Sequence, residues 1–506
     1  MNLISFQGRY RILHLTWFAF FLTFVIWFNF APLATTIKEQ MGLTEDQIRT
    51  IGICNVALTV PARVILGMLL DRYGPRLTFS WLLIFSTIPC LMFAFANSFN
   101  TLIISRLLLG IIGGGFVIGI RMVSEWFPPR EVGFAEGIYG GWGNFGSAFS
   151  ALTLASVAAW LSFGGSDLNW RLAIAITGII GGIYGVIYLF SVEDTPPGRT
   201  YHRPERHGAL EVTSKRDFWL LLIMSVPTVA VLAVLAFKLE NVGFFSIAQR
   251  NIVWAILLAI YLIQAFRIWQ VNKEVVSGEK RYPDHDRYPF RQVAMLELTY
   301  VTNFGSELAV VSMLPAFFER TFNLSPQLAG AVGSSYAFMN LFSRASGGAM
   351  SDRLGTRKWT MAILLLLMGL CYLMMSTIGS AWWLPAAVAL TMLASFFVQA
   401  AEGSTYSIVP LVKKRLTGQI SGLVGAYGTV GAVAYTTTYS YLPSGNTGDT
   451  IFFQVLGISG LIVGFLCVFF LKEPANSFAA DYEGFESETG LEEATEVTTE
   501  EAKTKR

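Results

Sequence analysis

Charged residues are scarce in this sequence. Only 14% of its 506 residues are Asp, Glu, Lys or Arg, whereas soluble domains carry about 25%. Because a charged side chain needs water or an opposite charge, the shortage predicts long segments that water does not reach. The formal net charge is only +2, which provides no basic surface for the backbone of DNA or RNA. We therefore expect no nucleic-acid partner.

Cysteine and histidine are also rare, with four of each. The cysteines all fall inside apolar runs, so we expect small core residues and no disulfide framework; they are Cys54, Cys90, Cys371 and Cys467. No histidine lies in the interior of the twelve main apolar segments, which removes histidine as a proton carrier there. The polar segments contain no metal-ligand cluster, nucleophile motif or nucleotide-binding loop. The sequence therefore predicts neither an enzyme nor a cofactor or metal site.

Apolar residues make up 53% of the chain, and they gather in runs of about 20 residues, enough to cross ~30 Å of hydrocarbon. Twelve runs in two groups of six are predicted to span a membrane, at residues 12–36, 47–70, 77–97, 101–127, 133–161, 170–192, 292–318, 327–350, 359–379, 382–411, 417–442 and 450–471. Two further stretches, 218–237 and 251–269, fit an added hairpin and give fourteen spans. The alternative is twelve spans with an interfacial central segment. The first run is too long for a cleavable signal peptide and is interpreted as the first span.

Lysine and arginine are unevenly distributed among the loops. They gather in loops 71–76, 193–217, 270–291 and 351–358 and are absent from 97–100, 162–169 and 442–449. The positive-inside rule then places both termini in the cytoplasm of a multi-pass cell-membrane protein. We expect a six-helix bundle at 1–192, central loops with two extra apolar segments at 193–290, and a second bundle at 291–472. The acidic segment 473–506 is predicted to be a disordered cytoplasmic tail.

The chain contains an internal duplication. At one constant offset of 281 residues, Arg63, Gly67, Asp71, Arg72, Gly74 and Arg76 recur as Arg344, Gly348, Asp352, Arg353, Gly355 and Arg357. At an offset of 285 residues, Arg130, Gly133, Gly137, Gly140, Gly143 and Gly146 recur as Arg415, Gly418, Gly422, Gly425, Gly428 and Gly431. So many ordered matches at nearly one offset indicate two related halves.

The repeated segments Gly67–Arg76 and Gly348–Arg357 resemble the cytoplasmic loop motif of the major facilitator superfamily, and Arg106–Gly110 resembles another of its motifs. The resemblance covers about residues 10–472 apart from the central hairpin. It implies an all-α membrane protein with the major facilitator fold, in which two pseudo-symmetric six-helix bundles rock about a midplane site. It also implies that the motif residues act in gating; they are Asp71, Arg72, Arg76, Asp352, Arg353 and Arg357.

Two arginines are predicted to lie inside the bilayer. Arg63 precedes Asp71 by two helical turns, which is about 12 Å, and Arg344 has the same position in the second half. A charge at that depth costs about 2.5–3.5 kcal/mol on insertion scales, so it lines a pathway or has a partner. Two guanidinium groups suit a small planar oxyanion and repel cations. The alternative is a salt bridge that stabilises one conformational state.

Glycines are predicted to line one face of the span 133–161 and one face of the span 417–442. A face of small residues lets helix backbones approach closely. Asn144 lies on the same stripe as Gly137, where a polar amide has room to meet a ligand, and Thr429 is its counterpart in the second half. For most of these glycines, tight helix packing alone is a sufficient reason.

The segments 140–146 and 425–431 resemble the signature of the nitrate/nitrite porter family. The resemblance implies nitrate, with nitrite as a related substrate, and it implies binding by the residues that match the family's site: Arg63, Arg344, Asn144, Tyr300, Phe304, Gly143, Gly428 and Thr429. Phe30 and Phe116 could add ring walls or could be ordinary core aromatics.

An inside-negative membrane potential opposes the uptake of a monoanion, at a free-energy cost of about 2.3 kcal/mol per 100 mV. Uptake therefore needs protons or exchange against another anion. Glu307 and Glu402 are the candidate proton carriers, with the role of fixed partner for Arg63 or Arg344 as the alternative. The sequence thus predicts a monomeric transporter in the lipid bilayer that imports nitrate with protons. A nitrate/nitrite exchanger, a transporter of phosphate or a small carboxylate, and a membrane sensor without transport are the competing hypotheses.

Overall fold

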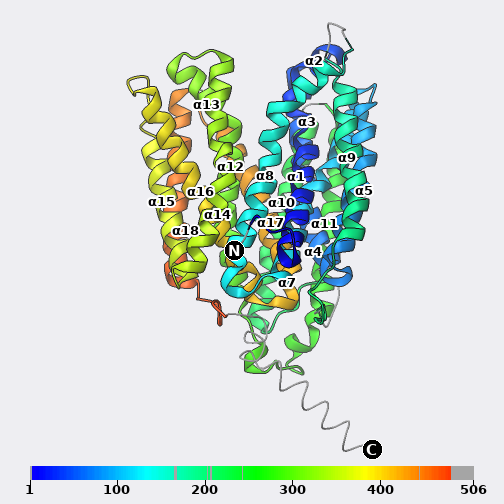
Figure 1. Cartoon of the computed structure of the whole chain (residues 1–506), viewed down its shortest axis with the longest axis vertical. Coiled ribbons are helices and arrows are strands. Elements are labelled where there is room, and N and C mark those ends of the chain that lie inside the picture. The colour runs from blue at the N-terminus through cyan, green and yellow to red at the C-terminus, as the bar shows by residue number, and fades with distance from the viewer. Residues whose placement is uncertain are drawn as a thin grey trace, which may run out of the picture.

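A computed structural model describes residues 3–163, 168–201, 203–204, 208–241, 243–443 and 445–479. Over these residues all regular secondary structure is helical, which confirms the all-α prediction. Figure 1 shows two groups of long helices that diverge towards α2 and α13 and approach each other towards α7. We call the end of the bundle at which Asp71 and Asp352 lie the motif end, because the repeated loop motif lies there.

The first half contains six long helical units. The first is α1 (Gly8–Phe28), which continues through η1 (Ala31–Leu33) into α2 (Ala34–Met41), and the second is α3 (Glu45–Ala57) followed by α4 (Thr59–Tyr73). The third is α5 (Pro75–Ala94), and the fourth joins α6 (Phe99–Leu109), η2 (Gly110–Gly114) and α7 (Gly115–Trp126). The fifth is α8 (Pro129–Trp160) and the sixth is α9 (Trp170–Ser191).

The second half repeats this plan. It consists of α12 (Phe290–Phe322), α13 (Pro326–Phe338) with α14 (Asn340–Arg353), α15 (Arg357–Met375), α16 (Leu384–Val412), α17 (Thr417–Tyr441) and α18 (Asn446–Phe470). The insert between the halves forms α10 (Lys215–Asn241) and α11 (Ile247–Ser277), with η3 (Asp284–Asp286) before α12, while η4 (Lys414–Leu416) joins α16 to α17. The predicted apolar stretches all fall on these helices.

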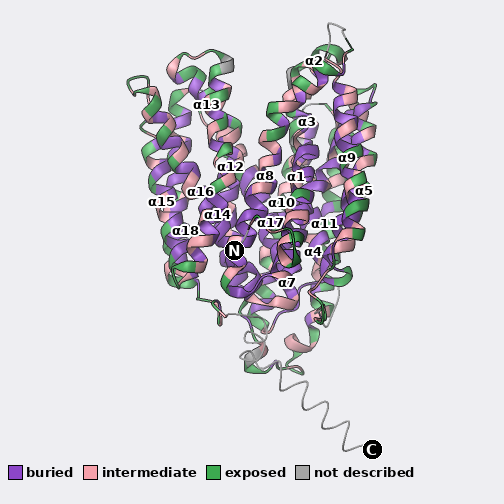
Figure 2. Cartoon of the chain, in the orientation of Figure 1, coloured by how far each residue is buried: buried purple, intermediate pink, exposed green. Residues whose placement is uncertain are grey.

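In the described part of the chain, eleven helical segments are long and apolar enough to cross a membrane, and α10 and α11 are among them. Three of the fourteen predicted spans do not meet this requirement of length and apolar character in the described residues, namely α8, the α13–α14 pair and α17. These helices carry the glycine stripes and the polar residues between the halves, so their mean hydropathy is lower. Figure 2 shows buried residues gathered where the two halves meet and exposed residues on the outer faces.

Both halves break their second helical unit at the same place. The break falls at Leu58 between α3 and α4 and at Met339 between α13 and α14, two positions that differ by the offset of the duplication. Arg63 and Arg344 each follow the break by five residues. The contacts are paired in the same way, because α4 packs against α17 of the other half and α14 packs against α8.

Glycine makes these contacts between the halves very close. A Cβ atom on Gly137 of α8 would lie 2.6 Å from the carbonyl oxygen of Arg344, and one on Gly422 of α17 would lie 2.5 Å from that of Arg63. Real Cβ atoms do not approach so near. The glycine stripes therefore bring the backbones of both arginine-bearing helices against the opposite half, which supports the packing interpretation for these positions.

The chain remains packed against the bundle beyond the predicted boundary at residue 472. Both carboxylate oxygens of Glu473 accept backbone N–H groups at the start of α15, from Arg357 and Lys358 at 2.9 Å each. Ala479 accepts a backbone hydrogen bond from Arg130 of the first half. Most of the predicted acidic tail, residues 480–506, lies outside the described residues.

Candidate functional site

Arg63 lies on α4 and is 1% exposed. Its Nε donates to the carbonyl oxygen of Gly113 at 3.2 Å, and its Nη1 donates to that of Gly425 at 2.5 Å. Its guanidinium carbon lies 5.1 Å from the centre of the Phe304 ring and 5.8 Å from that of Phe116. Among the residues that the structure describes, no carboxylate pairs with Arg63 and its Nη2 donates to no group. Arg63 is therefore a buried cation without a counter-ion.

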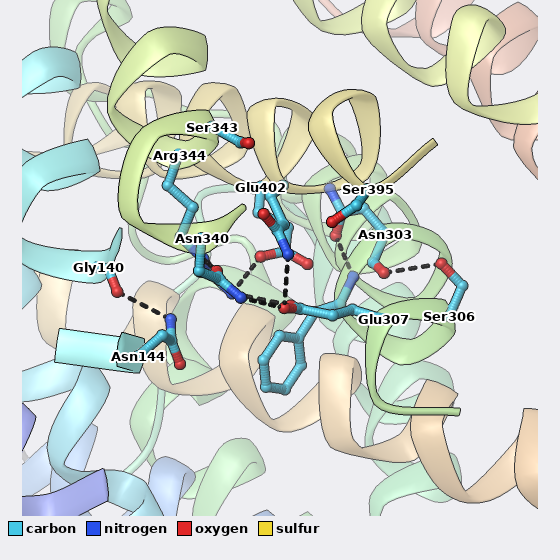
Figure 3. A network of polar contacts seen from close by, with 12 residues as sticks. Gly140, Asn144, Asn303, Ser306, Glu307, Asn340, Ser343, Arg344, Ser395 and Glu402 are labelled. Atoms are coloured by element: carbon cyan, nitrogen blue, oxygen red, sulfur yellow. Dashed lines mark hydrogen bonds and ion pairs between the residues drawn. The ribbon is translucent and has the colours of Figure 1, made fainter. Parts of the chain in front are cut away.

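Arg344 on α14 has a different environment, although it is equally buried at 2% exposure. Its Nη2 lies 3.1 Å from an oxygen of Glu307 and is also paired with Glu402, and its Nε donates to Asn340 at 2.8 Å. Asn340 and Gln399 donate their amide N–H groups to the other oxygen of Glu307, at 2.5 and 3.2 Å. Figure 3 shows these contacts converging on Glu307. The positive charge of Arg344 is thus already balanced within the protein.

The ring of Phe304 lies beside both Arg63 and Arg344. The guanidinium carbon of Arg344 lies 5.7 Å from the centre of the Phe304 ring, which also lies 5.1 Å from Arg63. One arginine comes from each half of the chain and both approach this side chain of α12. The duplication thus brings the predicted pair together across the interface between the halves.

Further rings form a wall beside the pair. Tyr300 stacks on Phe304 with ring centres 5.0 Å apart, and Phe116 of α7 lies parallel to Tyr300 at 6.3 Å. Tyr406 of α16 packs its ring at right angles against both, 5.0 Å from Tyr300 and 4.6 Å from Phe116. Of the two aromatics left open by the sequence, Phe116 belongs to this wall. Phe30 does not, because its ring packs against Phe93 and Arg106.

Glycines create the room for these side chains. A Cβ atom on Gly428 would lie 2.5 Å from Cδ1 of Tyr300 and 2.8 Å from the Phe304 ring, and one on Gly425 would lie 3.2 Å from Cδ of Arg63. Gly140, the counterpart of Gly425, has the Arg344 side chain 3.6 Å from its own Cβ position. The glycine repeat therefore shapes the surroundings of both arginines.

Two of the predicted site residues, Asn144 and Gly143, contact groups other than the arginines, and a third, Thr429, has no hydrogen-bond partner in the described residues. Asn144 donates its amide N–H to the carbonyl oxygen of Gly140, one turn earlier, at 2.9 Å, and no dashed contact joins it to Arg344 in Figure 3. A Cβ atom on Gly143 would meet the ring of Phe20, so this glycine accommodates an aromatic side chain. Thr429 is 1% exposed, and its hydroxyl has no hydrogen-bond partner in the described residues.

This geometry suits the binding of a small anion. Arg63 offers a guanidinium N–H group that no described residue accepts from, and no carboxylate among the described residues pairs with it. The aromatic rings of Phe304 and Phe116 lie beside it. A cation would meet an uncompensated positive charge in a medium of low dielectric constant, which is strongly repulsive. The site therefore favours a compact anion whose oxygens can accept from a guanidinium group.

The two motif aspartates bind helix N-termini of the opposite half. Asp71 accepts the backbone N–H groups of Gly418 and Gln419 at 3.0 and 2.9 Å, where α17 begins. Asp352 accepts those of Gly133 and Phe134 at 3.1 and 2.6 Å, four and five residues after the first residue of α8. Free N–H groups and the helix dipole favour a carboxylate at that position. These contacts join the two halves at the motif end.

The four motif arginines occupy two kinds of position. Arg357 is buried, pairs with Asp352 at 2.8 Å and donates to the carbonyl oxygen of Pro129 in the first half at 2.6 Å. The backbone N–H of Arg76 donates to Asp194 at 2.7 Å. Arg72 and Arg353 are exposed. Arg357 therefore reinforces the junction made by Asp352, whereas Arg72 and Arg353 face outward.

Sequence reasoning missed several residues of this region. Asn340 and Gln399 hold Glu307, and Tyr406 completes the ring wall. Asn340 precedes Arg344 by one helical turn, and Gln399 and Tyr406 lie about one turn before and one turn after Glu402 on α16, so helical spacing from the candidate residues could have indicated all three. Glu136 on α8 is 2% exposed, and neither of its carboxyl oxygens has a hydrogen-bond partner in the described chain.

Comparison with known proteins adds to this description. The family described as the Major Facilitator Superfamily matches residues 16–269 and 296–502. The chain is 58% identical over 512 residues to a protein named nitrate/nitrite transporter NrtP from a Picosynechococcus species, covering 95% of this chain and 96% of that protein. It is 54% identical to a protein of the same name from Nostoc punctiforme, covering 99% of each.

Among solved structures, the human organic anion transporter MFSD10 (TETRAN) is similar with a TM-score of 0.58. The similarity covers 91% of this chain and 100% of that one at 14% sequence identity. At that identity the likeness concerns the fold alone, and it agrees with two helical halves arranged as in Figure 1.

Proposed function

This chain belongs to the nitrate/nitrite porter family of the major facilitator superfamily, and on that premise we propose that it imports nitrate, and nitrite as a related anion, across the cell membrane. Transport proceeds by alternating access between the two halves, with protons as the co-transported ion. The anion binds between Arg63 and Arg344, beside the rings of Tyr300 and Phe304.

The observation that carries this proposal is the unbalanced charge of Arg63. A buried ion without a partner costs several kcal/mol, and Arg63 keeps its proton under all ordinary conditions. Its free Nη2 group and the adjacent ring of Phe304 leave one favourable remedy, which is an anion from outside the protein. Nitrate fits because it is small, planar and singly charged, and its oxygens lie in one plane with the guanidinium donors.

The charges of the site support proton coupling. Arg63 and Arg344 supply two positive charges, and Glu307 and Glu402 supply two negative charges when both are ionised. The charges of the empty site then sum to zero, although both carboxylates pair with Arg344 and neither is paired with Arg63. A bound nitrate makes the sum negative by one charge. A proton on one carboxylate restores neutrality. Each ligand therefore increases the affinity for the other, as thermodynamic linkage requires.

Glu402 is the better proton acceptor of the two carboxylates. Glu307 accepts hydrogen bonds from Asn340, Gln399 and Arg344, so both of its carboxylate oxygens already have donors. Glu402 is fully buried, and neither of its oxygens accepts a hydrogen bond within the described chain, although it pairs with Arg344. Protonation of Glu402 would release part of the Arg344 charge to the arriving anion.

The proposed orientation places the motif end in the cytoplasm. The basic loops 71–76 and 351–358 lie at this end, and the positive-inside rule assigns such loops to the cytoplasmic side. Both termini are then cytoplasmic and the bilayer surrounds the apolar outer faces. We assign residues 1–192 and 291–472 to the two bundles, 193–290 to the insert and 473–506 to the tail, and we expect a monomer.

A nitrate/nitrite exchanger is the second candidate. It is favoured by the fact that both carboxylates already pair with Arg344, so they could be fixed counter-ions. In that case the return step would need a second anion in the site in place of a proton.

Uptake of nitrate into proteoliposomes of the purified full chain tests the proposed substrate. We expect saturable nitrate flux that nitrite inhibits and that phosphate and acetate inhibit poorly, because a doubly charged or bulkier anion does not fit the ring wall. Empty liposomes provide the background. Absence of flux would favour a sensor without transport, and equal inhibition by phosphate would refute the assignment to nitrate.

A further inference from the structure

A second cationic site lies outside the pathway. A pocket of about 470 Å³ opens at the motif end, between the start of α10, the end of α11 and the segment 278–289 that leads to α12. Four basic side chains line it, namely Lys215, Lys280, Arg281 and Arg287. One carboxylate, Asp217, is also part of the lining.

Two of the basic side chains of this pocket, Lys215 and Arg281, have no counter-ion among the described residues. Asp217 is engaged elsewhere, because its carboxylate accepts the backbone N–H of Phe290 at 3.1 Å and the hydroxyl of Ser214 at 2.7 Å. Arg287 pairs with Asp284, an exposed residue. Lys215 and Arg281 make no ion pair or hydrogen bond with any described residue. Lys215 and Arg281 are thus two cations on one concave surface that an external anion could pair with.

The surrounding residues indicate the depth of the pocket in the membrane. Along α11, on the side of the pocket away from the motif end, a long apolar face is exposed that includes Ile256, Ile260 and Ile263. Trp219 follows Lys215 by one turn of α10 and is 56% exposed, and Trp269 lies two turns before the end of α11 and is 45% exposed. Exposed tryptophans mark the level of lipid headgroups. The pocket therefore opens at the boundary between hydrocarbon and cytoplasm, where a phosphate group of a lipid is held.

We propose that this pocket binds the phosphate headgroup of an anionic phospholipid of the cytoplasmic leaflet. Its acyl chains lie along the exposed faces of α10 and α11, and Lys215 and Arg281 contact the phosphate oxygens. Basic pockets of this kind beside membrane helices are suited to anionic headgroups. The inference uses the orientation given under the proposed function, but it does not depend on nitrate as the substrate.

The segment that lines the pocket also contacts the turn between α16 and α17. Tyr282, one of its lining residues, donates its hydroxyl to Glu211 at 3.1 Å, and Glu211 pairs with Arg415 at 3.3 Å just before α17. Lys413 at the end of α16 pairs with Asp286 of the same segment. A lipid that holds the segment 278–289 in place therefore also stabilises the turn between α16 and α17.

Thermal unfolding of the purified full chain in neutral detergent tests the proposal, with a short-chain phosphatidylglycerol as the added probe. We expect stabilisation by this lipid, and its apparent affinity should fall about 30-fold in the K215Q/R281Q variant, which is about fivefold per removed charge. The matched control is R216Q/K273Q, which removes the same charge from neighbouring positions that do not line the pocket. It should bind the lipid like the native chain.

Three results would overturn the proposal. Equal loss of affinity in both double variants would mean general attraction to a basic surface. No loss in K215Q/R281Q would mean that the lipid binds elsewhere. Equal protection by inorganic phosphate at the same concentration, lost in K215Q/R281Q, would mean that the pocket takes a soluble phosphate and not a lipid. Nitrate flux is not measured in this experiment, so the proposed function can fail or hold independently.

Discussion

Replacing Arg63 by lysine separates the charge of this side chain from the shape of its guanidinium group. In the native chain, Nε and Nη1 hold the carbonyl oxygens of Gly113 and Gly425 while Nη2 remains free for an anion. A lysine ammonium group cannot keep both carbonyl contacts and reach the anion from the same position. The substitution therefore removes at least one charge-assisted hydrogen bond to nitrate.

Hydrogen bonds to charged groups contribute about 1.5–3 kcal/mol, so R63K should weaken nitrate binding by about 10- to 150-fold. Isothermal titration calorimetry with the purified variant measures this change. The matched control is R106K, another fully buried arginine of the first half that donates to Asn29 and to the carbonyl oxygen of Trp27, away from Phe304. It should affect thermal stability more than affinity. If R63K binds nitrate as tightly as the native chain, the role assigned to the free Nη2 group of Arg63 is refuted.

Three further changes test other parts of the site. E402Q should abolish proton-driven nitrate accumulation but leave nitrate exchange measurable in proteoliposomes, and accumulation at the native level would remove Glu402 from coupling. G428A places a Cβ atom 2.5 Å from Tyr300 and should strongly reduce nitrate flux; G330A, with nothing within 4 Å, is the matched control and should transport normally. D352N leaves the buried Arg357 without its carboxylate partner and should weaken the junction with α8 by about 3–5 kcal/mol, so cysteine labelling from the motif end should increase, and unchanged labelling would exclude this role in gating.

The all-helical fold could be predicted from the sequence because lipid imposes a strong constraint. Every backbone N–H and C=O in a bilayer needs a partner within the protein, so runs of about 20 apolar residues become helices. The duplication then predicted the convergence of Arg63 and Arg344, since symmetric halves place equivalent residues near a common axis. Their contacts with the single ring of Phe304 agree with that expectation.

The unequal environments of the two arginines could not be predicted in the same way. Arg344 is balanced by Glu307 and Glu402, which come from two other helices, whereas no carboxylate in the described part of the chain pairs with Arg63. Both glutamates were candidates from the sequence, but a linear pattern does not reveal which arginine they contact. Asn144 illustrates another limit: its place on the glycine stripe was evident, yet its amide bonds to the carbonyl oxygen of Gly140 in its own helix.

The proposed coupling of nitrate to a proton is tested most directly by nitrate flux into proteoliposomes with an imposed pH gradient. The membrane potential is clamped, and no nitrite is present on either side. A site whose neutrality needs one proton for each nitrate predicts uphill nitrate accumulation when the outside is acidic, and loss of preloaded nitrate when the gradient is reversed. Nitrate movement that ignores the pH gradient but responds to preloaded nitrite would contradict proton coupling and establish exchange.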